Sequence, residues 1–457
     1  MSSSVDKENS PKAMVAAAEP KRRLGIGNQL ALSSFWFATN LHWGALLLII
    51  IPHQAKVISP SNPVQAMQWI FFFGAFVALI TPLVAGALSD RSTSRFGRRR
   101  PYMVCGVAVN LIGLAIMGYA VAHLSLPLYI VGYLIVQFGN NAAGAAYAGI
   151  IPDMVPADQH GEASGYMATM TQAGMIIGAF GSGILMGKEQ HMLAFLIIGV
   201  VMVVFVVLTA LTVHEKPLET NPPPLTFAEF MRGLIEPLKS PDFFWVLVTR
   251  ALVTLGMWCV QPFIQNYLSD VLKVKNDAEM GGYLLATILL FATVTGLIGG
   301  KLSDAIGRKK VVYVANTLIA ICSVAFVFSH SLLYTFIVGA LYGVGYGAYF
   351  SVDWALACDV LPNPEDAGKD MGIWHVSMVL PQIFAPLLAG FILDHVGTSE
   401  LVNGVRHYAL QGYQAAFTLG AIFLMLGAYF LRNVRDRRER EQMAAMLSTS
   451  AAQDQSQ

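Results

Sequence analysis

The stretch SDRSTSRFGRRRP, residues 89–101, places five arginines within ten residues, between two apolar runs at 66–88 and 102–122. Each run reaches the roughly 20 residues that an α-helix needs to cross a bilayer. The whole chain is 55% hydrophobic and 12% charged, whereas about a quarter of the residues of a soluble domain are charged. The arginine-rich stretch is therefore expected to be a short loop between two membrane-spanning helices.

Outward from this loop, the apolar runs predict an all-α membrane protein with twelve transmembrane helices. The predicted spans are 29–51, 66–88, 102–122, 126–151, 161–186, 192–213, 243–268, 282–302, 311–328, 332–358, 371–393 and 413–431. The expected parts are a cytosolic tail (1–24), a six-helix bundle (25–213), a cytosolic linker with a short amphipathic helix (214–242), a second six-helix bundle (243–431) and a second cytosolic tail (432–457).

The distribution of basic residues predicts the orientation. With the N-terminus in the cytosol, 23 of the 29 Lys and Arg residues fall in cytosolic tails and loops, and one, Arg250, lies inside a span. Cytosolic loops carry such an excess of basic residues. We therefore expect a multi-pass protein of the plasma (inner) membrane with both termini cytosolic. The five basic residues left on the opposite face are Lys56, Lys188, Lys273, Lys275 and Arg406.

The sequence offers little for catalysis or cofactor binding. It contains no HExxH motif, no GxSxG motif and no compact carboxylate pair at a membrane face, so we do not expect an enzyme. The four cysteines lie in separate apolar segments without CxxC spacing, which favours core packing over a metal site. The net charge of +1 says nothing about nucleic-acid or acidic partners, and no nucleic-acid partner is expected. No cofactor or metal is expected, and the tails are too short for a signalling domain.

The chain contains an internal repeat. GALSDRSTSRFGRRR after span 2 returns as GKLSDAIGRKK after span 8, where Asp90 matches Asp304. IIPDMVPADQHGEASG after span 4 is echoed by LACDVLPNPEDAGKDMG after span 10, where Asp153 matches Asp359. Matched loops in the same order predict two six-helix halves in parallel orientation, between which a substrate is held.

These motifs resemble the major facilitator superfamily. GxLSD…GR(R/K)(R/K) is similar to the signature loop of that family, and the lengthened first copy resembles the branch of sucrose carriers and glycoside–pentoside–hexuronide symporters. NN…IIPDMVPADQHGEASG and VDWALACDVLP…DMGIWH are similar to the same branch, and the likeness runs from residue 29 to 431. The resemblance implies two pseudo-symmetric six-helix halves, alternating access, and a central cavity lined by spans 1, 4, 7 and 10.

The resemblance also implies that the signature loop gates the outward-open form. Carboxylates beside arginines can latch the two halves in one state. Alternatively, the arginines only set the topology and contact lipid phosphates, which is the interpretation that we favour for Arg95, Arg99 and Arg100. The expected latch consists of Gly86, Asp90, Arg91, Gly97 and Arg98, with Asp304, Gly307 and Arg308 in the second copy.

Ionisable residues inside spans are candidates for ion coupling, because a buried charge costs several kcal/mol unless it is paired. Arg250 in span 7 lies ~12 Å from the cytosolic start of the helix, and Asp353 in span 10 lies ~9 Å from its cytosolic end, at 1.5 Å per residue. The two predict an ion pair, with His375 of span 11 nearby. Protonation of Asp353 would free Arg250 for a substrate; a permanent structural salt bridge is the alternative.

Amides and aromatic rings dominate the polar inventory of spans 1, 4, 7 and 10, and such groups suit a neutral polyhydroxylated ligand. They equally suit hydrogen bonds between helices. Span 4 lacks the arginine and aspartate of the sucrose carriers: Tyr147 stands where the arginine would be, and Gln137 lies near the position of the aspartate. The proton site is therefore expected at Asp353. The candidate substrate-binding residues are Asn40, His42, Trp43, Asn140, Asn141, Tyr147, Trp258, Gln261, Tyr346 and Tyr349.

We therefore expect a monomeric secondary transporter that moves a small polar solute, a sugar or glycoside by preference, with symport of H⁺ or Na⁺. The alternatives are an efflux carrier for an amphipathic small molecule and a carrier-like membrane sensor.

Overall fold

A computed structural model describes residues 23–150, 154–156, 159–212, 226, 232, 235–360, 367–402, 404–435 and 439. Most of both predicted tails and the predicted amphipathic helix of the linker lie outside these residues. Asp153 also lies outside them, and the side chains of Asp304 and His375 are not among those described.

Within the described residues, twelve long helical segments coincide with the twelve predicted spans. In the N-terminal half they are α1 (Ile26–Ala45) continued by η1 (Leu46–Ile50) and α2 (Ile51–Ile58), then α3 (Pro63–Asp90), α4 (Arg100–Ala122), α5 (Leu126–Ala148), α7 (His160–Gly187) and α8 (His191–Thr212). In the C-terminal half they are α10 (Pro241–Trp258) continued by η4 (Gln261–Phe263) and α11 (Ile264–Asp270), then α12 (Asp277–Ile306), α13 (Arg308–Phe326), α14 (Leu332–Asp359), α15 (Ala367–His395) and α16 (Leu410–Phe430). Two short 3₁₀ helices, η3 (Glu236–Lys239) and η6 (Leu431–Asn433), flank the C-terminal half.

Proline fixes the start of several of these helices. It occupies the first turn of α3, α4, α5 and α10, as Pro63, Pro101, Pro127 and Pro241. In the first turn the missing N–H group costs no helical hydrogen bond, and the fixed φ angle already suits the helix.

Eleven of the twelve segments are long and apolar enough to cross a membrane by composition alone. The remaining one, α5, has 23 residues, but Gln137, Asn140 and Asn141 lower its mean hydropathy. It packs between α3 and α4 inside the N-terminal half, where neighbouring helices can satisfy the amides. The predicted count of twelve helices is thus confirmed.

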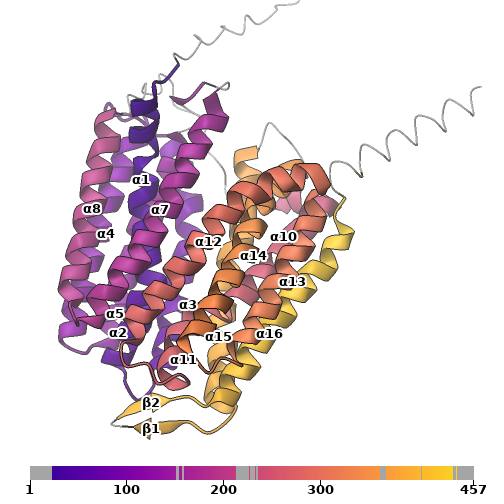
Figure 1. Cartoon of the computed structure of the whole chain (residues 1–457). Helices are drawn as coiled ribbons and strands as arrows, with labels where there is room; N and C mark the ends of the chain where they lie inside the picture. The colour runs from indigo at the N-terminus through magenta and orange to yellow at the C-terminus, as the bar shows by residue number, and fades with distance from the viewer. Residues whose placement is uncertain are drawn as a thin grey trace, which may run out of the picture.

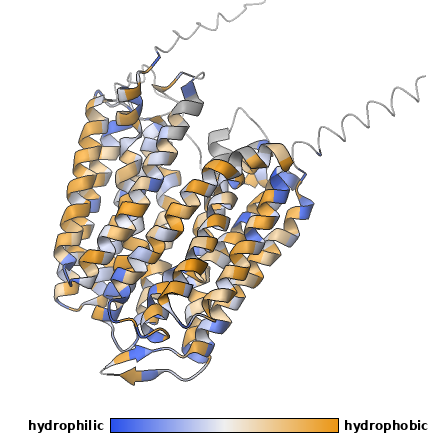
Figure 2. Ribbon diagram, viewed as in Figure 1, coloured by the Kyte–Doolittle hydropathy of each residue, from blue (hydrophilic) through white to orange (hydrophobic). Residues whose placement is uncertain are grey.

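The outer surface of the helices is apolar. Large aliphatic side chains on it are strongly exposed, among them Leu297 at 74% and Leu211 at 70%, and the ribbon is hydrophobic along most of its outer length (Figure 2). Apolar exposure on this scale is incompatible with water and fits contact with lipid chains.

The packing of the helices reproduces the sequence repeat. In the N-terminal half, α1 packs against α7 and α8, α5 against α3 and α4, and α4 against α8. In the C-terminal half, α10 packs against α15 and α16, α14 against α12 and α13, and α13 against α16. Across the halves, α3 packs on α15 and α12 packs on α7. In both pairs the second helical segment of one half packs on the fifth segment of the other half. The two six-helix halves are therefore pseudo-symmetric, as predicted.

The first helical segment of each half is interrupted at a matched position. The π-helical turn η1 precedes Pro52, and the 3₁₀ turn η4 contains Pro262, 210 residues later. Proline removes a backbone donor and bends a helix. The turns η1 and η4 contact each other across the halves, so both helices bend where the halves meet.

The bundle has two different ends. We call the end that carries the loop after Asp90 and the turn before Arg308 the basic end; both described chain ends leave the bundle there (Figure 1). The opposite end carries a β-hairpin and is called the hairpin end. Its strands β1 (Glu400–Val402) and β2 (Val405–His407) pair antiparallel, with Gly404 in the two-residue turn at φ 81°, a backbone conformation that favours glycine.

The halves are joined at the hairpin end. The Arg406 N–H donates to the Pro60 carbonyl at 2.9 Å, and Gln68 Nε2 donates to the Leu387 carbonyl at 3.0 Å. Toward the basic end the helices of the two halves diverge (Figure 1). The described conformation is closed at the hairpin end.

Candidate transport site

The predicted ion pair between Arg250 of α10 and Asp353 of α14 is present and buried, with residue exposures of 2% and 4%. The Tyr349 hydroxyl donates to Asp353 Oδ1 at 3.1 Å. The guanidinium carbon of Arg250 lies 3.2 Å from the centre of a Trp374 ring, and its Nη2 lies 3.4 Å from Met378 Sδ. Each charge thus has a counter-charge and a further polar or aromatic partner, which offsets part of the cost of burial.

Sequence reasoning missed Trp374 and Met378, because nothing in span 11 shows which of its faces meets α10. The position of the neighbouring His375 relative to the pair stays a prediction, since its side chain lies outside the described ones.

An aromatic column extends along α14 from the ion pair. The Tyr342 and Tyr346 rings are stacked with centres 6.4 Å apart, and Tyr346 and Phe350 are 4.6 Å apart. Gln261 of η4 lies beside the Tyr342 and Tyr346 hydroxyls. Of the candidate residues in the C-terminal half, the structure therefore brings together Gln261, Tyr346 and Tyr349.

One face of the first helical segment carries four partly exposed residues: Trp36, Asn40 and Trp43 of α1 and Leu47 of η1. Their spacing of four, three and four residues places them in one stripe along the helix. Asn40 Nδ2 donates to the Trp36 carbonyl at 2.8 Å and lies 3.4 Å from Thr171 Oγ1 of α7. Asn40 and Trp43 therefore share an accessible face, as a ligand-binding role requires.

Three other candidates are buried between helices of the N-terminal half. His42 is fully buried, with Nδ1 3.2 Å from Asn140 Nδ2 on α5. The Tyr147 hydroxyl donates to the Leu32 carbonyl, and its ring meets Phe35 edge-on at 5.0 Å. These contacts hold α5 against α1, the arrangement that the helix-packing alternative predicts.

The two remaining candidates differ in their surroundings. Asn141 is partly exposed, and its Nδ2 donates to Gln137 Oε1 at 2.7 Å. Gln137 Nε2 in turn donates to the Tyr133 hydroxyl oxygen at 2.6 Å, so the three side chains form a chain of hydrogen bonds. Trp258 is 9% exposed and meets Phe71 of α3 edge-on at 6.1 Å, so it packs across the halves.

At the basic end the partner of Asp90 differs from the expected ones. Arg99 Nη2 lies 2.8 Å from Asp90 Oδ1, and Arg99 is 7% exposed. Its guanidinium also approaches the Ala146 carbonyl and occupies the space beside Gly149, where a Cβ atom would lie 2.0 Å from Arg99 Cζ. The assignment of Arg99 to topology alone was wrong. Its guanidinium is accommodated by Ala146 of α5 and by Gly149, the residue after that helix, which the loop sequence cannot reveal.

In the second copy, Arg308 Nη1 pairs with Asp359 Oδ2 at 2.8 Å. The matched glycines Gly97 and Gly307 have φ angles of 104° and 103°, which residues with a Cβ atom rarely adopt. Gly86 has open space around the position of a Cβ atom, so packing does not require glycine there.

Each ion pair described at the basic end lies within one half. The pairs are Asp90–Arg99, Arg308–Asp359, Lys309–Glu439 and Asp242–Arg435. Arg91 caps the C-terminus of α3, and Arg98 is a partly exposed residue of the same loop. The predicted latch between the halves is therefore not formed by the described pairs in this conformation, which is closed at the other end. The side chain of Asp304 lies outside the description.

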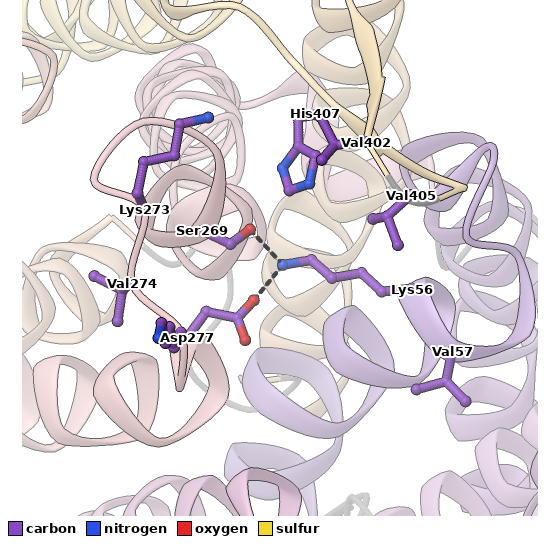
Figure 3. Close-up of a pocket in the computed structure, with 10 residues that line it drawn as sticks. Lys56, Val57, Ser269, Lys273, Val274, Asp277, Val402, Val405 and His407 are labelled. Atoms are coloured by element: carbon purple, nitrogen blue, oxygen red, sulfur yellow. Dashed lines mark hydrogen bonds and ion pairs between the residues drawn. The ribbon is translucent and has the colours of Figure 1, made fainter.

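At the hairpin end, Lys56 of α2 reaches from the N-terminal half into the C-terminal half (Figure 3). Its ammonium group forms an ion pair with Asp277 and donates to Ser269 Oγ at 2.9 Å. This three-residue contact, which we call the clamp, borders a cavity of about 520 Å³ that Lys273 and His407 also line. The sequence did not reveal the clamp, since Lys56 and Asp277 are 221 positions apart.

The hairpin is anchored beside the clamp. Asp270 of α11 accepts hydrogen bonds from the Tyr408 N–H at 3.1 Å and the Tyr413 hydroxyl at 2.6 Å, and it pairs with His407 Nδ1 at 2.8 Å. The buried Asp270 therefore ties the connection between α15 and α16 to the end of α11.

Comparison with known proteins agrees with this architecture. The Major Facilitator Superfamily profile matches residues 29–292 and 246–449. The sucrose transport protein SUT5 of Oryza sativa subsp. japonica is 24% identical over 81% of this chain and 86% of its own length. A multi-drug resistance efflux pump PmrA homolog of Lactococcus lactis subsp. lactis is 22% identical over 57% of this chain and 64% of its own length.

Among solved structures, a variant of the nucleoside transporter NupG superposes with a TM-score of 0.68 at 13% identity, covering 89% of this chain and 99% of its own. At this identity the likeness establishes the fold alone. With the profile match on both halves, the repeat and the twelve-helix packing, the chain belongs to the Major Facilitator Superfamily.

Proposed function

We propose that this transporter moves a small neutral polyhydroxylated solute, a sugar or glycoside, by alternating access coupled to proton symport. The observation that carries the proposal is the buried Arg250–Asp353 pair, bordered by Tyr349 and Trp374. The sucrose transport relative supports the solute class. In this proposal the hairpin end is extracellular and the basic end cytosolic, in the plasma membrane, and one chain is the working unit.

The solute would bind between the accessible stripe of α1 and the aromatic column of α14. Asn40 and Asn141 offer amide groups that both donate and accept hydrogen bonds, as sugar hydroxyls require. Trp43 and Tyr346 offer ring faces against which a pyranose can stack, and Gln261 adds an amide from the C-terminal half.

Asp353 is the proposed proton carrier. While it is ionised, Arg250 is held by its counter-charge and is not available to the solute. A proton on Asp353 removes that attraction and leaves the guanidinium free to donate to a solute oxygen, so the proton and the solute are taken up together. Release of both on the cytosolic side restores the pair.

The test is uptake by the purified protein in proteoliposomes, across a panel of mono- and disaccharides, with an imposed pH or Na⁺ gradient. Asp353→Asn is expected to abolish proton-driven accumulation while exchange of solute across the membrane persists. Glu400→Gln, an exposed carboxylate on β1, is the matched control and should transport normally. Intact accumulation by Asp353→Asn would refute the coupling role, and accumulation driven by Na⁺ alone would refute the proton.

Efflux of an amphipathic compound is the second candidate. The efflux-pump relative and the two tryptophans of the α1 stripe, Trp36 and Trp43, favour it. Extrusion of an amphipathic dye from loaded proteoliposomes, with no sugar uptake, would support this function against the first.

A further inference from the structure

Three metal-ligating side chains of the N-terminal half converge at the hairpin end. His53 lies on α2, whereas Glu189 and His191 lie where α7 passes into α8. Glu189 Oε2 is 3.5 Å from His53 Nε2 and 3.0 Å from His191 Nε2. One nitrogen of each imidazole and this carboxylate oxygen all lie within 4.8 Å of one another.

These separations suit a tetrahedral ion. With zinc–nitrogen and zinc–oxygen bonds of about 2.0–2.2 Å, the ligand atoms of a tetrahedral zinc site lie about 3.3–3.5 Å apart. The two distances to Glu189, 3.5 and 3.0 Å, lie close to this range, and the two imidazole nitrogens lie within 4.8 Å of each other. Two imidazoles and one carboxylate favour a borderline divalent ion such as Zn²⁺ over Mg²⁺ or Ca²⁺, which prefer oxygen ligands.

The local backbone and burial indicate a built arrangement. Glu189 has a φ angle of 57°, an uncommon conformation for a non-glycine residue, and its carboxylate contacts both rings. His53 is 8% exposed, and its Nδ1 has no hydrogen-bond partner among the described residues; the same holds for Nδ1 of His191. The ring centres are 5.5 Å apart, so two imidazoles share a single carboxylate.

We propose that His53, Glu189 and His191 bind one Zn²⁺ ion at the hairpin end. Both histidines bind through one ring nitrogen and Glu189 through one oxygen. The fourth position is open to water or to a ligand from solution, because the Glu189 side chain is 66% exposed. Lys56 lies one helical turn after His53, so the ion sits beside the clamp. The site does not depend on the proposed solute or coupling ion.

The experiment measures Zn²⁺ binding to the purified, chelator-stripped chain in detergent, by competition with a fluorescent zinc indicator. The unmodified protein should bind one ion per chain. His53→Gln, Glu189→Gln and His191→Gln should each weaken that affinity at least ~10-fold, since each removes one of three ligands. Mg²⁺ and Ca²⁺ at the same concentration should not displace Zn²⁺.

His123→Gln is the matched control, because this exposed histidine follows α4 at the same end of the same half. Its Nδ1 contacts the Tyr119 carbonyl at 2.9 Å, and its ring stacks on that of Tyr119. It should bind Zn²⁺ like the unmodified protein. Glu189→Gln alters an exposed side chain, so a monodisperse size-exclusion profile is expected for it. Absence of one-to-one binding, or equal affinity in all four variants, would overturn the proposal.

Discussion

Removal of the clamp should open the hairpin end. Lys56→Met keeps the length of the side chain but deletes the charge that joins α2 to Asp277 and Ser269. Without it, Asp277 in a largely buried position loses its counter-charge, while the backbone contacts of the hairpin remain. The closed conformation should therefore be destabilised relative to the open one.

The size of the effect follows from the burial of the pair. The side chains of Lys56 and Asp277 are 15% and 14% exposed, which places them between a solvent-exposed pair, worth about 0–1 kcal/mol, and a fully buried one, worth about 3–5 kcal/mol when broken. We expect about 1–2 kcal/mol. Because 1.4 kcal/mol is a factor of ten, the ratio of open to closed molecules should rise about 5- to 30-fold.

Double electron–electron resonance measures this ratio directly. In a variant without native cysteines, spin labels at Gln190 and Lys275 report the distance between the halves at the hairpin end. Lys56→Met should increase the long-distance population, and Asp277→Asn should do so less, because an amide oxygen still accepts from the ammonium group.

Lys273→Met is the control, since this exposed lysine lines the same cavity. The charge-swapped double variant Lys56→Asp with Asp277→Lys should restore part of the closed population. An unchanged distance distribution in Lys56→Met, or an equal change in Lys273→Met, would refute the reasoning.

Two further substitutions probe the packing between the halves and the buried ion pair. Gly183→Val should also open the hairpin end, because a Cβ atom there would lie 2.9 Å from the backbone of α12. The overpacking should destabilise the closed conformation by about 1–3 kcal/mol. Gly181→Val is the control: it has open space at its Cβ position and should leave the distance distribution unchanged. Asp353→Asn should lower the free energy of unfolding by about 3–5 kcal/mol, because it leaves the guanidinium of Arg250 buried without a counter-charge. Thermal denaturation in detergent measures this loss of stability. If the double variant Asp353→Asn with Arg250→Met is less destabilised than Asp353→Asn, the loss comes from the unpaired charge and not from packing. Equal Tm values for Asp353→Asn and the unmodified protein would contradict the prediction.

The ion pair could be predicted because depth along a helix can be read from the chain. Arg250 and Asp353 lie at similar depths in spans 7 and 10 of the same half, and an unpaired charge at that depth would be too costly. Trp374 and Met378 could not be found in the same way, because the rotation of α15 about its axis is set by packing.

The same limit applies to the substrate-binding candidates, some of which are accessible and others buried. An amide inside a span must find a hydrogen-bond partner, but the sequence does not say whether that partner is a ligand or another helix. Asn40 and Asn141 prove accessible, whereas His42, Asn140 and Tyr147 are buried against neighbouring helices. The spacing along the first helical segment does not separate the two groups, because the buried residues Phe35, Thr39, His42 and Leu46 follow the same spacing of four, three and four as the partly exposed stripe.

The sequence by itself determined the twelve helices, their division into two repeated halves and the clustering of basic residues at one end, because hydrophobic length, matched loops and charge distribution are local properties of the chain. Only the tertiary structure decided the partner of Asp90, the clamp at Lys56, and the meeting of His53 with Glu189 and His191. The clamp and the meeting of His53 with Glu189 join helices far apart in the chain, whereas the Asp90–Arg99 pair lies between consecutive helices and depends on the space beside Gly149. All three depend on how the helices rotate and tilt against one another. Packing fixes those angles collectively, and no short stretch of sequence records them.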